Sequence, residues 1–459
     1  MLIYLYILLF LRINLKNTVM KNERLKFHYV FMFSLLSLFS CENSLLNECA
    51  KVSEDQNSDL VCQGQERAIA VLNQFRSEVN PNTRSLPDIN IKSVKSETYQ
   101  IETSQQDART RSNISNPDTI DIYTIVFEKD GKTGFSILSP DERVGRMYAY
   151  TEDGSISDTI TNKGLALHLN GIKEICKADF AMYYTHGGDS AVTRAKGIMY
   201  PNFMEFEWAQ TEPFNALFPK LCGGKPALAG RCTVAAAEII MYYKKKFYDW
   251  SDGGILFTSN NPLTRNVQSN NNTRSVDPDS YDYKLLKDHF RITNSSPAAV
   301  KNEAARLMYD IAVLLKSRWG CEVHYGDDTR ADFIDAEEVF GPFLGIYFKK
   351  TYPERYRILE HFESNISKID KQKMISHIAL KNPIMVQGLY SYGPIRAVWL
   401  YTGVKFRGTT IDEFYINWGG GGRSNGWYAF NNNLGYVPYE VLFVNAVNPD
   451  GTPGGGTIQ

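Results

Sequence analysis

One stretch decides the fold of this chain: Ala229-Gly-Arg-Cys-Thr-Val-Ala-Ala-Ala-Glu-Ile-Ile-Met-Tyr-Tyr243. A glycine precedes its first polar side chain, and small residues fill its middle. Lys244-Lys-Lys246 follows, and these cations suit the negative end of a helix dipole. Because small side chains let neighbouring elements approach closely, the stretch predicts a helix that lies centrally in its domain.

The residues after this helix predict an antiparallel sheet. Residues 301–316 have the apolar spacing of a second helix, and 259–280 form a polar insertion. Strand patterns then follow at 383–390, 397–404 and 414–419. Helices followed by strands predict an α+β domain over residues 200–448, with a flexible tail at 449–459.

A smaller α+β domain is predicted upstream, over residues 65–185. Residues 65–78 place apolar side chains at helical spacing, and three short apolar runs between 120 and 151 are separated by Asp-Gly turn signals. Residues 102–118 are rich in Ser, Thr, Asn and Asp and predict a loop. Residues 186–199 show little apolar periodicity and predict an exposed linker.

The N-terminus predicts export and lipid anchoring. Residues 1–40 end in a signal peptide whose basic segment starts at Met20, which we expect to be the true start. Ser40-Cys41 closes the apolar run, so we expect lipid on Cys41 and a polar tether over residues 41–64. The expected location is the bacterial cell envelope or the secreted fraction. An ordinary secretory signal cut elsewhere, or a buried helix, is the alternative.

Composition narrows the functional classes. The chain of 459 residues carries 50 Lys and Arg against 51 Asp and Glu, which argues against a nucleic-acid partner. Seven cysteines lack CxxC or Cys/His ligand spacing, so no metal or other cofactor is expected. Cys176, Cys222 and Cys321 are expected to be small buried residues without partners.

The larger domain resembles the streptopain (C10) family of papain-like cysteine peptidases, and the smaller one resembles the family's propeptide, whose fold is shared by a group of protease inhibitors. The resemblance covers residues 65–448 and implies a cysteine endopeptidase, a hydrolase acting in proteolysis. Its carriers are 66–75, 134–144, Trp208-Ala-Gln-Thr-Glu-Pro-Phe-Asn215, Ala229-Gly230 with its helix, 307–313, Tyr325-Gly326, Asn417-Trp-Gly419 and Gly426-Trp-Tyr428.

Two positions depart from that family. An alignment without gaps places Arg231 where the family has its nucleophilic Cys, and Cys232 follows one residue later, about 100° around the helix. Ala397 stands where the family has its catalytic His. Losing a catalytic member costs roughly 10⁴ to 10⁶ in rate, so the resemblance implies a pseudopeptidase.

The rest of the implied cleft is present in the sequence. Asn417 and Trp418 match the family's Asn-Trp pair, and Gln210 stands where an oxyanion donor is expected. Arg231 at a helix start suits a carboxylate, from the propeptide-like domain or from a bound peptide.

Two functions remain open at this point. The first is a lipid-anchored, inactive homologue that binds peptides or peptidases in a cleft covered by its own propeptide-like domain. The second is an active secreted endopeptidase with Cys232 as nucleophile. A purely structural surface protein would not explain a propeptide-like domain beside a peptidase-like one. The expected partners are therefore a peptide or protein, the chain's own first domain and, through the lipid, a membrane.

Overall fold

The structure is a computed structural model. It describes residues 56–80, 88–101, 118–144, 147–185, 197–250, 263–266, 273–321, 331, 339–340, 343–344, 359–363, 371–390, 396–408, 410–430 and 436–444. The predicted signal peptide, Cys41, most of the linker and the tail lie outside these residues. In the described part of the chain, no helix is both long and apolar enough to cross a membrane.

The first part of the chain contains two long helices and a run of antiparallel strands. The elements are α4 (Gln56–Val79), β1 (Asn90–Ile101), β2 (Asp118–Lys129), β3 (Lys132–Leu138), β4 (Met147–Thr151), the 3₁₀ helix η1 (Ile156–Ile160), α5 (Lys163–Thr185) and β5 (Ile198–Tyr200). The β2–β3 turn holds Asp130 and Gly131 at positive φ, as the Asp-Gly signal predicts.

The second part begins with helices and ends with strands. The elements are α7 (Arg231–Trp250), β6 (Leu263–Asn266), β7 (Thr273–Val276), η2 (Pro278–Ser280), α8 (Tyr283–Leu286), α9 (Ala298–Leu314), β8 (Leu359–Glu363), α11 (Lys371–Ala379), β9 (Ile384–Tyr390), β10 (Arg396–Arg407), β11 (Thr410–Asn417), β12 (Gly426–Ala429) and β13 (Tyr436–Val444). The α+β class is confirmed.

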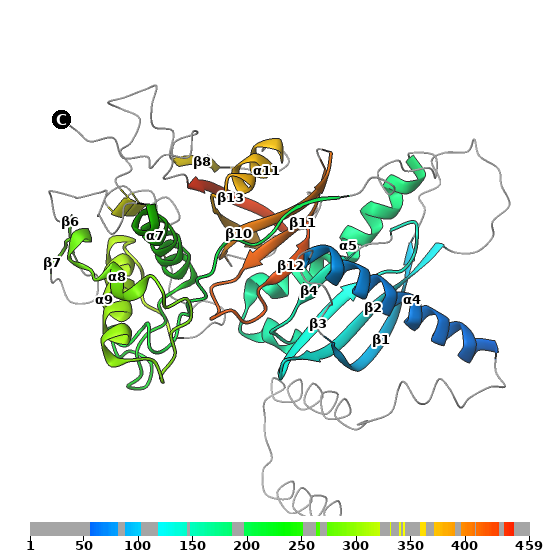
Figure 1. Cartoon of the computed structure of the whole chain (residues 1–459), viewed down its shortest axis with the longest axis horizontal. Helices are drawn as coiled ribbons and strands as arrows, with labels where there is room; N and C mark the ends of the chain where they lie inside the picture. Colours follow the sequence, from blue (N-terminus) through cyan, green and yellow to red (C-terminus); the bar gives the residue numbers. More distant parts are fainter. Residues whose placement is uncertain are drawn as a thin grey trace, which may run out of the picture. The chain divides into compact units, whose positions relative to one another are not determined.

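A single antiparallel sheet runs through both parts. Its strand order is β1-β2-β3-β4-β12-β11-β10-β9-β13-β8, and β5 also pairs with β10. The junction is the pairing of β4 with β12, in which Thr151 lies opposite Gly426 and Tyr150 opposite Trp427 (Figure 1). Gly426 is required there, because a Cβ would stand 2.1 Å from the Tyr150 carbonyl oxygen. Main-chain hydrogen bonds therefore connect the two predicted domains.

The sheet buries both faces. Side chains of α5 and α11 pack on one face in a cluster that includes Ala397, Trp399, Trp418 and Tyr428. Helix α7 packs on the other face against Val398 and Leu400 of β10. The alternation of Ala397 and Val398 between clusters follows from the two-residue period of a strand. As predicted, α7 is central, and Val234 through Met241 are all buried.

Two sequence predictions need correction. Helix α4 begins at Gln56, so the final nine residues of the predicted tether are helical. Gly64 lies against Tyr123, where a Cβ would stand 2.1 Å from the hydroxyl oxygen, so the end of the tether packs onto the sheet. Cys222 and Cys321 are bonded to each other, with Cα atoms 5.2 Å apart across 99 residues of sequence. Sequence spacing alone gave no sign of this pairing.

Candidate functional site

The candidate site lies at the start of helix α7. Gly230 adopts φ 84°, a conformation that suits glycine, and Arg231 is the first helical residue. The amide of Ala229 donates to the carbonyl of Gln210 over 3.0 Å. Gln210, predicted to flank the site, is thus beside the helix start.

The guanidinium of Arg231 spans the two halves of the sequence. Its Nη1 donates to the carbonyl of Trp418 at the end of β11, and its Nη2 donates to the carbonyl of Thr161 over 3.2 Å. Both of these acceptors are neutral carbonyl oxygens, and the carboxylate partner that the sequence suggested stays a prediction. The arginine therefore lies across the start of the helix as a cross-link.

Cys232 lies elsewhere. It is 5% exposed and belongs to the apolar cluster that packs α7 against α9 and β10. One residue along a helix is a rotation of about 100°, which accounts for the different surroundings of Arg231 and Cys232. The thiol is thus in the core while the residue before it faces Trp418.

Ala397 lies under the first turn of α5. It is 2% exposed, and the position that a Cβ of Gly164 would take is 3.6 Å from the Cβ of Ala397 and 2.6 Å from the ring of Trp418. Helix α5 can approach this closely only because residue 164 is glycine. One turn later, His168 places its ring edge-on to Trp418 and Tyr428, with centroids 6.4 and 5.1 Å away.

Asn417 is part of a buried polar network. Its Nδ2 donates to Oε2 of Glu238 and to the carbonyl of Phe206, both over 3.0 Å, and its Oδ1 accepts from the amide of Gly419. The other oxygen of Glu238 accepts from the Trp208 amide over 2.7 Å. Burial raises the pKa of Glu238 well above its usual range, although the two hydrogen bonds oppose this. Asn417 therefore ties α7 to β11.

Comparison with known proteins identifies this region. The model of the Peptidase C10 family matches residues 208–428. We call this matched region, which is a little under half of the chain, the C10 domain. Among solved structures, the chain is similar to the active wild-type interpain A cysteine protease of Prevotella intermedia, with 17% identity over 53% of this chain and 94% of that chain, and a TM-score of 0.40. That likeness carries no statement about activity. No curated protein sequence matches.

Residues 153–168, which we name the covering segment, hold the glycine-rich loop of the C10 domain. The carboxylate of Asp158 accepts from Arg423 and from the hydroxyl of Ser424, both over 2.8 Å, and also from the amide of Ser155. Burial alone would raise the pKa of Asp158, but these hydrogen bonds lower it. A carboxylate of the first domain is thus bound by the second, through Arg423.

The disulfide fixes the loop that enters α7. Cys222 precedes the loop 223–230, and the amide of Leu228 donates to the carbonyl of Gly320, beside Cys321, over 3.0 Å. This hydrogen bond and the disulfide together tie the start of α7 to the segment that follows α9. In the described ranges, no cluster of three His, Cys, Asp or Glu side chains could hold a metal ion.

The sequence alone does not reveal which residues contact the site from other parts of the fold. Gly164, Asp158 and Arg423 were not singled out, although Ser155-Ile-Ser-Asp158 has the spacing of a capping box, and that box is formed. A capping box predicts a helix start and does not predict what its carboxylate binds. The predicted site residues Arg231, Gln210, Trp418 and Ala397 lie around the starts of α7 and α5, whereas the side chain of Cys232 is buried in the core.

Proposed function

We propose that the chain is a non-catalytic homologue of the C10 peptidases that binds peptides or peptidases, and that its own covering segment is the first occupant of the site. The observation that carries the proposal is the guanidinium of Arg231, which bonds to Trp418 and Thr161 at the position that the family resemblance assigns to the nucleophile. Ala397 stands at the position that the family resemblance assigns to the catalytic His, and its methyl side chain cannot accept or donate a proton.

The surroundings of Cys232 argue against the alternative, an active peptidase with Cys232 as nucleophile. A cysteine peptidase requires a thiolate next to a base at a helix start. Cys232 is 5% exposed and packs among apolar side chains, so a substrate carbonyl could not approach its sulfur without displacing the helix. An active enzyme based on Cys232 would therefore need a rearranged α7.

The site is also filled. Gly164 rests on Trp418 and Ala397, and Asp158 anchors the loop that begins after Trp418. A substrate would have to displace both contacts. These contacts favour retention of the first domain on the C10 domain.

Hydrolysis by the full-length protein tests the proposal. With casein and an epoxide probe for cysteine peptidases, we expect no cleavage and no covalent labelling of the chain. The matched variant is Arg231→Lys, which retains the charge and supplies no thiol, and it should behave identically. Probe attached to Cys232, or casein cleavage lost in Cys232→Ser, would contradict the proposal.

Anchoring through Cys41 is proposed separately, on the sequence alone. The basic segment after Met20, the apolar run and Ser40-Cys41 support lipid attachment. Cys41→Ser should move the protein from the membrane fraction to the soluble fraction, while Ser44→Ala should leave it in the membrane fraction. Equal membrane association of both variants would contradict the anchor and leave the inactive-site proposal unaffected.

A further inference from the structure

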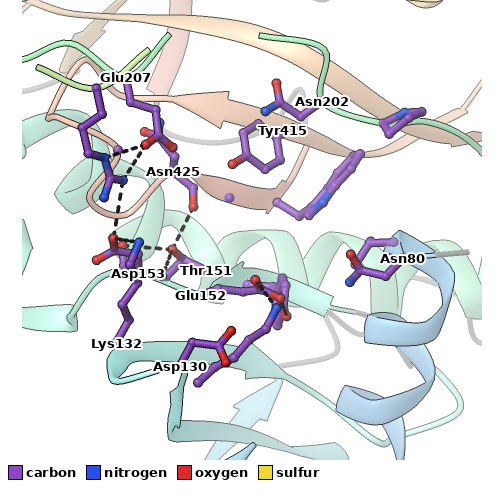
Figure 2. A pocket seen from close by; sticks show the side chains of 18 residues that line it. Asn80, Asp130, Lys132, Thr151, Glu152, Asp153, Asn202, Glu207, Tyr415 and Asn425 are labelled. Atoms are coloured by element: carbon purple, nitrogen blue, oxygen red, sulfur yellow. Dashed lines mark hydrogen bonds and ion pairs between the residues drawn. The ribbon is translucent and has the colours of Figure 1, made fainter. Parts of the chain in front are cut away.

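A cavity of about 500 Å³ lies on the side of the sheet away from Tyr428, and Arg231, Gln210, Ala397, Asn417 and Trp418 are not among its lining residues (Figure 2). It is bounded by the end of α4, the β2–β3 turn, β4, β12 and residues 201–207. Its volume falls in the range of roughly 300 to 1,000 Å³ that small-molecule sites have. Its charged lining residues are Lys129, Asp130, Lys132, Glu152, Asp153, Glu207 and Arg291.

The three cations of the lining are already neutralised. Lys129 pairs with Glu152 at 2.5 Å, and Lys132 pairs with Asp153 at 2.8 Å. Arg291 pairs with Glu207 at 2.5 Å, and Figure 2 shows Glu207 on the side of the cavity opposite Asn80. An anionic ligand would have to break one of these pairs to reach a cation, at the cost of leaving the carboxylate of that pair uncompensated. A neutral ligand can accept from the cations and donate to the carboxylates at once.

Two aromatic side chains supply the remaining surface. The rings of Tyr415 and Trp427 meet edge to face with centroids 5.6 Å apart. Trp427 is 4% exposed, and both side chains line the cavity. Among the residues that the structure describes, the Tyr415 hydroxyl and the Trp427 indole N–H meet no hydrogen-bond acceptor. Burial and the charges of Glu207 and Glu152 raise the pKa of Tyr415, so its hydroxyl remains a donor.

A glycine leaves room for the charged wall. Gly422 has φ 85°, and a Cβ there would stand 2.3 Å from Nη2 of Arg291 and 2.5 Å from Oε2 of Glu207. The ion pair can lie against the main chain only because this side chain is absent. The glycine-rich loop thus forms part of the cavity as well as the contact with Asp158.

We propose that this cavity binds a neutral, hydroxyl-rich small molecule of the size of a mono- or disaccharide. The three ion pairs supply donors and acceptors for hydroxyl groups, and Asp130 supplies a further acceptor. The ring faces of Tyr415 and Trp427 suit the C–H face of a sugar ring, and their free donors suit its oxygen atoms. The cavity shares the glycine-rich loop and Asp153 with the contact at Asp158, but its lining includes neither Arg231 nor Ala397.

Ligand-observed NMR on the full-length protein tests the proposal, with mannose, galactose, N-acetylglucosamine, maltose, lactose and chitobiose as probes. We expect at least one to bind with a Kd at or below about 5 mM. Tyr415→Phe and Lys132→Met should each weaken that binding about fivefold, since each removes one hydrogen-bonding group. Lys92→Met removes an exposed ion pair with Glu128 outside the cavity and should leave the Kd unchanged.

The variant Lys132→Met keeps the test valid if Tyr415→Phe fails to fold, because the Lys132 side chain is 48% exposed. Absence of binding by all six saccharides at about 50 mM would overturn the proposal. So would saccharide binding that Lys132→Met leaves unchanged. Spermidine and inorganic phosphate serve as charged probes, and binding of either without any saccharide would also overturn it.

Discussion

Trp427 and Tyr428 are consecutive residues of β12, and their side chains lie on opposite faces of the sheet in opposite surroundings. Tyr428 is covered by Trp418 and by His168 of α5. Trp427 borders an open cavity. The face of the sheet around Trp418 and Tyr428 is therefore filled by the chain's own side chains, while the face beside Trp427 has space for a ligand. The proposed loss of activity thus involves the surroundings of the site as well as positions 231 and 397.

Gly164→Val is expected to have the largest effect on the filled face. A Cβ at residue 164 would stand 2.6 Å from the Trp418 ring, so valine must push α5 away. Overpacking of this kind costs about 3 kcal/mol of unfolding free energy. Urea unfolding measures the loss, and hydrogen exchange should rise in residues 153–168 and not around Trp427.

Asn170→Val is the matched control, since Asn170 is exposed in the same helix. Its unfolding free energy should stay within about 0.5 kcal/mol of the parent. Equal stability of Gly164→Val and Asn170→Val would show that the first turn of α5 does not rest on Trp418.

Acid should also lower the free energy of unfolding, because His377 on the filled face is buried in its neutral form. Burial lowers the pKa of His377 to about 4, and Lys373 acts in the same direction, against the hydrogen bonds of Nε2 to the carbonyls of Val444 and Pro383. Between about pH 6.5 and 4 the unfolded chain binds a proton that the folded chain does not. Stability therefore falls as pH falls through this window, by at most about 3 kcal/mol.

Unfolding free energies at pH 7 and pH 4 measure this effect. In His377→Gln the fall between the two values should be smaller by about 2 to 3 kcal/mol, because glutamine does not titrate. The same fall in the parent and in the variant would mean that His377 gains its proton without loss of the fold.

Asp158→Asn should cost less, about 2 kcal/mol. The carboxylate accepts from Arg423 and Ser424, and an amide weakens the charged bond and places a donor against the other. Asp130→Asn is the control, because Asp130 is exposed in a turn with positive φ, which asparagine also adopts. Thermal unfolding compares the two, and equal melting temperatures would contradict the anchoring role of Asp158.

Arg231→Met should have the smallest effect, about 1 kcal/mol. It removes two hydrogen bonds to carbonyl oxygens but retains the apolar stem of the side chain. The loss should be seen in urea unfolding, and the part that comes from these two bonds should not respond to salt, since both acceptors are neutral. A strong salt dependence would instead support the carboxylate partner that the sequence suggested.

The sequence predicted elements with strong local patterns. The small-residue helix is α7, and the apolar runs at 383–390 and 397–404 are β9 and β10. The rotation between Arg231 and Cys232 also followed from helix geometry alone. These features depend on residues close together in the chain, which is why a single sequence contains them.

The sequence could not predict contacts made across the fold. The pairing of β4 with β12 joins residues about 275 apart, and the Cys222–Cys321 disulfide joins residues 99 apart. Gly164 carries no pattern that says it will rest on Trp418. Long-range pairings depend on the whole topology. The contacts that fill the site can therefore be seen only in the structure.

Cleavage of the linker provides the most direct test of the proposal that the site is filled and non-catalytic. A specific protease site placed within residues 186–196 would be cut in the purified protein, followed by size exclusion and the epoxide probe. We expect both fragments to elute together at about 10 µM, a modest demand for a domain-sized interface, and Cys232 to stay unlabelled. Release of the first domain with labelling of Cys232 would contradict the account.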